Sequence, residues 1–302
     1  MRNQSIKSLL ALLLGACVLP SFAAVNILAC EPEWGALAQE LGGDKVRVHN
    51  ATTAFQDPHH VQARPSLLAK ARNADLVVCS GAQLEIGWLP ILQQQAGNPK
   101  IQPGQPGDFA AAQYVRMLEV PASVDRAQGD VHPGGNPHIH TDPRNIGLVA
   151  PALAQRLAQV DPANAAHYQA QHQAFAARWQ AAIAHWERQA APLRGMSVVV
   201  HHQAFVYLEN WLGLRQVAAL EAKPGVEPSA AHLSAVLAQL QRQPAKAVLR
   251  SVYNDARGAQ WLAGRAGIPV VVLPFTVGGS EQAQDLFGLF DDTVQRLLAA
   301  RK

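Results

Sequence analysis

Short apolar runs alternate along the chain with segments whose apolar residues recur at helical spacing. Strands and helices that alternate in this way are typical of a parallel sheet covered by helices. We therefore expect an α/β fold, with each sheet parallel. The expected strands are 25–29, 46–48, 74–78, 196–200, 217–219, 247–249 and 270–273, and the expected helices are 33–41, 66–73, 89–95, 145–159, 163–189, 204–212, 229–241, 256–266 and 281–300.

The segment 163–189 predicts one unusually long helix. It follows Asp161 and Pro162, which suit a cap and a first turn, and it contains no glycine or proline. At ~1.5 Å per residue it spans roughly 40 Å, more than one small domain needs. We expect it to join two α/β lobes, with residues 24–161 as the N-terminal lobe, 162–190 as the connecting helix and 191–302 as the C-terminal lobe.

The N-terminus has the pattern of an export signal. A basic start with Arg2 and Lys7 precedes an apolar run, 9–19, that is too short to span a bilayer, and small residues at Ala23 and Ala24 suit cleavage. We expect residues 1–23 to be removed and the protein to work in the periplasm. The alternative is a lipoprotein anchored through Cys17, and mass analysis of the mature N-terminus separates the two.

The charge balance argues against a polyanionic partner. Removal of residues 1–23 takes away two basic residues and no acid, so 25 basic residues become 23 against 22 acids, and no run of Lys or Arg remains. Neither nucleic acid nor an anionic membrane surface is therefore expected as a partner. We expect a monomer that binds a small molecule or ion and another protein.

Two cysteines, Cys30 and Cys79, remain in the mature chain, and each follows an expected strand. If those strands are neighbours, the two sulfurs meet at the strand ends and form a disulfide in an oxidising compartment. Two buried thiols are the alternative.

Histidines are the candidate metal ligands. His59, His138 and His202 lie in three segments far apart in the chain, and His59 and His202 follow expected strands. Loops beyond the carboxyl ends of parallel strands are where α/β sheets place ligands, and imidazoles from separate loops suit zinc. Their neighbours are alternative or transient ligands, namely His60, His132, His140 and His201.

Taken together, these residues resemble the solute-binding proteins of bacterial ABC transporters for zinc and manganese, over essentially the whole mature chain. The motifs that carry the resemblance are Asp57-Pro58-His59 with Pro65; the run 74–78 with Gly81, Leu84, Glu85 and Trp88; Pro137-His138-Ile139 with Asp142, Pro143 and Asn145; His202-Gln203-Ala204-Phe205 with Tyr207, Gly213 and Leu214; and the run 225–229.

The resemblance implies a metal site in the cleft between the lobes, with His59 and His138 from the first lobe and His202 from the second. A histidine at the third position resembles the zinc branch, so Zn²⁺ is expected as the transported ion and Mn²⁺ is less favoured. The resemblance also implies delivery to a permease in the inner membrane and no catalysis.

One departure concerns the fourth ligand. The family commonly supplies a carboxylate after the last strand, but residues 273–279 contain no acid. The remaining candidates are Glu281, Asp285, His60 and His140, or water. Because zinc enzymes keep an open fourth position, a secreted zinc hydrolase is the first alternative function, although no His-Glu-x-x-His pattern is present. The second is a surface lipoprotein that buffers metal or acts in adhesion.

Overall fold

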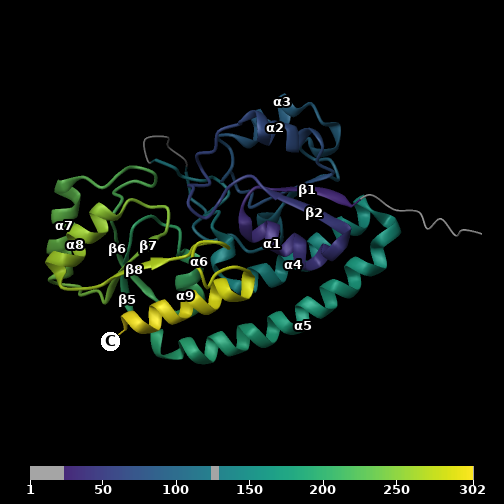
Figure 1. The fold of residues 1–302 in the computed structure, drawn as a ribbon. Helices are drawn as coiled ribbons and strands as arrows, with labels where there is room; N and C mark the ends of the chain where they lie inside the picture. The colour runs from purple at the N-terminus through teal and green to yellow at the C-terminus, as the bar shows by residue number, and fades with distance from the viewer. Residues whose placement is uncertain (1–23, 124–128, 302) are drawn as a thin grey trace, which may run out of the picture.

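The computed structural model describes residues 24–123 and 129–301, and these form two lobes, each built on a four-stranded parallel sheet (Figure 1). The strand order is β2-β1-β3-β4 in the N-terminal lobe and β6-β5-β7-β8 in the C-terminal lobe. The α/β prediction with two parallel sheets is confirmed. The strands are β1 Val25–Ala29, β2 Val46–Asn50, β3 Leu76–Cys79, β4 Asp108–Ala110, β5 Ser197–Val200, β6 Arg215–Ala219, β7 Ala247–Ser251 and β8 Val270–Leu273.

Helices cover both faces of each sheet because the buried strands are apolar on both sides. In β1, Ile27 and Ala29 belong to the central core of the molecule, whereas Leu28 packs on the other face with α2 and α3. In the C-terminal lobe, Val198 of β5 likewise belongs to the central core, whereas Val199 packs on the other face with α7 and α8. The helices are α1 Pro32–Gly42, α2 Pro65–Arg72, α3 Leu89–Ala96, α4 Pro143–Val160, α5 Ala165–Ala190, α6 Val206–Leu212, α7 Ala230–Leu240, α8 Ala256–Ala266 and α9 Leu286–Ala300.

Helix α5 runs along both lobes, as the uninterrupted helical pattern predicts (Figure 1). Its Trp179 and Trp186 pack edge to face, with ring centroids 5.2 Å apart, and both contact Phe290 of α9. One continuous apolar core therefore extends beneath both sheets, since residues of β1, β3, β5 and β7 share it. Such a core resists rotation of one lobe against the other.

Two elements differ from the sequence pattern. No strand is expected between 79 and 196, yet β4 pairs with β3 at the edge of the sheet, in register Val77 with Asp108. A three-residue strand is too short to leave a periodic signal. The last helix begins at Leu286 rather than at 281, because Asp285 caps it by accepting a hydrogen bond from the Gly288 N–H at 2.7 Å.

A disulfide joins Cys30 and Cys79, with Cα atoms 4.8 Å apart. The two residues follow β1 and end β3, and these strands are hydrogen-bonded neighbours. Of the two alternatives that the sequence leaves open, the structure therefore contains the disulfide. The bridge lies in the smaller apolar cluster beneath α2 and α3.

Candidate metal site

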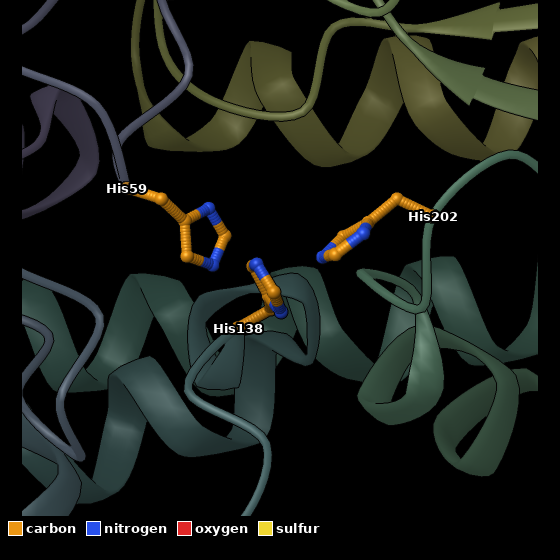
Figure 2. Close-up of side chains that lie close together, drawn as sticks. All are labelled: His59, His138 and His202. Atoms are coloured by element: carbon orange, nitrogen blue, oxygen red, sulfur yellow. The ribbon is translucent and has the colours of Figure 1, made fainter. Parts of the chain in front are cut away.

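The imidazoles of His59, His138 and His202 converge in the space between the two lobes (Figure 2). Their ring centroids are 5.3 to 5.6 Å apart, and one ligating atom from each lies within 4.8 Å of the others. All three residues are buried, at 7%, 1% and 7% exposure. Side chains that are 79 and 64 residues apart along the chain are thus brought to one point.

A shared local turn positions two of the three. In Asp57-Pro58-His59, the Asp57 Oδ1 accepts hydrogen bonds from the His59 main-chain N–H at 3.0 Å and from its Nδ1 at 2.7 Å. In Asn136-Pro137-His138, the Asn136 Oδ1 makes the same two contacts with His138, at 3.1 and 2.9 Å. Asp and Asn favour this turn because the side-chain oxygen reaches the amide two residues ahead.

His202 is oriented differently, by a residue from another strand. It follows β5, and its Nδ1 lies 2.7 Å from Oε2 of Glu221, which follows β6. Glu221 is not identified as a site residue by sequence reasoning, since nothing local links it to His202. The same carboxylate also accepts the Gly225 N–H at 2.7 Å.

All three imidazoles therefore bond an oxygen through Nδ1 and leave Nε2 for a metal. The His138 Nε2 is buried and has no hydrogen-bond partner among the described residues. A buried nitrogen without a partner has lost its hydrogen bonds to water and gained nothing in return. A bound cation would provide the missing interaction. The donor set fits a divalent metal that prefers nitrogen.

The electrostatic environment of His138 favours its neutral form. Burial, together with the neighbouring His202 and His59, lowers the pKa of His138 well below the ordinary value. A lowered pKa means that the neutral, ligating form persists to more acidic pH. Burial opposes ionisation of Asp57, but its hydrogen bond with His59 and the charge of that ring outweigh this and lower its pKa to about 2.

The segment after β8 contributes an aromatic wall and no acid. Phe275 is 7% exposed, and its ring lies 5.8 Å from that of His138 and 4.8 Å from that of His140. Its φ of 65° is uncommon for a residue with a side chain. The structure thus has a phenyl ring where the family resemblance leads us to look for a carboxylate.

The four less certain ligands lie outside the group of three. His140 is buried, with Nδ1 3.1 Å from Oε1 of Glu33 and Nε2 3.1 Å from the Phe275 carbonyl oxygen. His60 is exposed and lines a separate surface pocket. Glu281 and Asp285 are also exposed, and Asp285 is engaged as the cap of α9. Their ligand roles stay predictions that the geometry does not favour.

A second set of close ligand-type atoms surrounds the disulfide and comprises Cys30, Cys79 and Glu85. Bonded sulfurs are not thiolates and do not hold a metal in this way. Burial raises the pKa of Glu85 to about 7, and the carboxyl accepts the Gly81 N–H at 3.1 and 3.2 Å. These contacts make Glu85 a buried hydrogen-bonding anchor for the loop after β3.

Glu221→Ala is expected to weaken Zn²⁺ binding roughly 10- to 100-fold, the usual cost of losing an outer carboxylate partner of a ligating histidine. The substitution frees the His202 ring to rotate and removes the oxygen that holds the proton on Nδ1. Competitive titration of metal-stripped protein measures the effect. Glu227→Ala, at an exposed position nearby, is the matched control, and equal affinities for the two variants would contradict the role of Glu221.

Comparison with known proteins places this site in a family. Residues 27–300 match the family described as ZnuA, zinc-uptake complex component A, periplasmic. The high-affinity zinc uptake system protein ZnuA of Paracoccus denitrificans (strain Pd 1222) is 25% identical over 282 residues, covering 82% of this chain and 82% of that protein. The manganese ABC transporter substrate-binding lipoprotein PsaA of Streptococcus pneumoniae is 21% identical over 258 residues, covering 82% of this chain and 79% of that protein.

The fold agrees with this assignment. A crystal structure of ZnuA matches with a TM-score of 0.76 and 24% identity, covering 92% of this chain and 100% of that chain. The predicted resemblance is confirmed, because the family match extends over nearly all the described residues. This chain belongs to the ZnuA family, the metal-binding components of zinc and manganese ABC transporters.

Proposed function

We propose that this protein captures Zn²⁺ outside the cytoplasm with His59, His138 and His202 and delivers it to an ABC-type permease for uptake. The observation that carries the proposal is the convergence of three imidazoles, with one ligand nitrogen of each within 4.8 Å of the others, on rings whose Nδ1 lies at hydrogen-bonding distance of an oxygen. As a member of this family, the protein is a transport component and not an enzyme.

The choice of zinc rests on the chemistry of the ligands. Imidazole nitrogen suits zinc, whereas carboxylate and carbonyl oxygen suit manganese. Among the described residues, the group within 4.8 Å contains three histidines and no carboxylate. The family includes a relative named for manganese, so the donor set of this chain, rather than the family, supports zinc.

Two further features belong to the same proposal. The family is periplasmic by description, and PsaA is a lipoprotein by name, so the protein acts outside the cytoplasm. We favour cleavage near Ala24 over lipidation of Cys17, and the signal itself, residues 1–23, lies outside the described residues. Of the alternative functions, the zinc hydrolase finds no support in a family of transport components.

The test is metal selectivity, measured by competitive titration of metal-stripped mature protein with Zn²⁺ and Mn²⁺. We expect one tight zinc site and manganese binding at least about 100-fold weaker, since a nitrogen-only site lacks the oxygen donors that manganese prefers. Cells that lack the gene should take up less labelled zinc than cells that carry it. Expression of the wild-type chain should restore the uptake. Manganese binding within tenfold of zinc, or loss of manganese uptake alone, would overturn the assignment to zinc.

Zinc affinity should also fall between neutral pH and about pH 5, because protons compete for imidazoles whose ordinary pKa is about 6.5. The lowered pKa of His138 delays the protonation of that ring to more acidic pH. An affinity that stays constant over this interval would argue against imidazole ligation.

A further inference from the structure

A fourth imidazole adjoins the three. His132 lies on the loop that precedes His138, and its Nε2 is 3.3 Å from the Nε2 of His59, with the ring centroids 5.3 Å apart. A cavity of about 160 Å³ is lined by His132 together with His138 and His202. The His132 ring therefore shares this cavity with His138 and His202 and contacts His59 beside it.

We propose that His132 is the fourth metal ligand and completes an all-nitrogen site. This inference rests on the proposed function and specifies its coordination. Two nitrogens bound to one tetrahedral zinc at about 2.0–2.1 Å are separated by roughly 3.3–3.4 Å. The separation between the His132 and His59 Nε2 atoms equals this edge of the tetrahedron.

The ring of His132 has contacts on two sides. Its Nε2 faces His59, and it also has a hydrogen bond with the main chain of Gln83, in the loop after β3. Ala82 and Gln83 have positive φ angles of 49° and 69°, which cost energy for residues with side chains. This strained turn places the Gln83 main chain within hydrogen-bonding reach of His132.

The loop that carries His132 is attached to the C-terminal lobe. The Asp130 N–H donates to the Pro224 carbonyl oxygen at 2.9 Å. The approach is close, because a Cβ on Gly129 would lie 2.3 Å from that oxygen and one on Gly225 would lie 2.1 Å from Oδ2 of Asp130. The Gly225 N–H in turn bonds Glu221, the residue that holds His202.

These contacts couple His132 to both lobes. His59 belongs to the N-terminal lobe and His202 to the C-terminal lobe. The loop that contacts both lobes places His132 beside these two histidines. His132 is not in the group whose ligand atoms all lie within 4.8 Å of one another, so ligation requires its ring to move inward from the contact with His59. His132 also supplies the donor that the acid-free segment after β8 lacks.

The test compares zinc-loaded His132→Gln and His132→Cys with the wild-type chain. X-ray absorption at the zinc edge counts imidazoles, and we expect four in the wild type and three in His132→Gln, with affinity lowered at least roughly 10- to 100-fold. In His132→Cys a sulfur should be seen about 2.3 Å from zinc. A residue that acted only through the fold would give no sulfur ligand. His185→Gln, at an exposed position of α5, is the control and should retain four imidazoles.

The result that would overturn the proposal is zinc bound by three imidazoles in the wild type, with the same affinity in His132→Gln and no sulfur in His132→Cys. That outcome leaves the three-histidine site and the proposed function intact. Failure of the wild-type chain to bind zinc would instead refute the proposed function itself. The two failures are therefore distinguishable in one set of samples.

Discussion

His138→Ala is expected to lower zinc affinity by more than roughly 100-fold, beyond the cost of losing an outer-shell partner. Its ring lies 5.4 Å from that of His59 and 5.3 Å from that of His202, slightly closer to each than those two rings are to one another, at 5.6 Å. It is also the most buried of the three, at 1% exposure, and its Nε2 has no partner among the described residues. Without it, only His59 and His202 remain of the three converging histidines.

Competitive titration against a chromophoric chelator measures this change, with thermal unfolding of the metal-free protein to show that the variant is folded. His185→Ala is the matched control, because His185 is exposed on α5 and is not one of the three converging histidines. The control should bind zinc like the wild type. Retention of affinity within threefold in His138→Ala would mean that the metal is bound elsewhere.

Loss of the disulfide is expected to have the largest effect on stability. The bridge closes a loop with a sequence separation of 49 residues, for which the chain-entropy relation gives about 4 kcal/mol at 25 °C. Both residues are buried, so Cys30→Ala/Cys79→Ala avoids placing new hydroxyl groups in the apolar cluster. Urea unfolding of the metal-free protein measures the difference in free energy of unfolding.

The wild-type chain unfolded in the presence of a reductant is the matched control, since it loses the same cross-link without any substitution. The two samples should lose similar stability. A loss below about 1 kcal/mol in both would show that the bridge contributes little beyond packing, contrary to the entropic estimate.

Much of the fold follows from local sequence. The strand pattern at 25–29 and 74–78 and the uninterrupted helix after Asp161 are confirmed, because backbone propensity and apolar periodicity are properties of neighbouring residues. The turns that orient His59 and His138 are local in the same sense, since Asp57 and Asn136 each reach the residue two positions ahead. The boundaries of the two lobes stay predictions.

Other features depend on residues that only folding brings together. Glu221 orients His202 across 19 positions of chain, and His132 meets His59 across 73. The edge strand β4 exists because β3 offers it a partner, and the aromatic wall at Phe275 depends on packing against another lobe's histidines. Sequence periodicity reports which side of an element is buried, but not which distant side chain lies opposite. The sequence therefore determined the three histidines and the scaffold, whereas tertiary structure decided how each ring is anchored and which fourth group stands beside them.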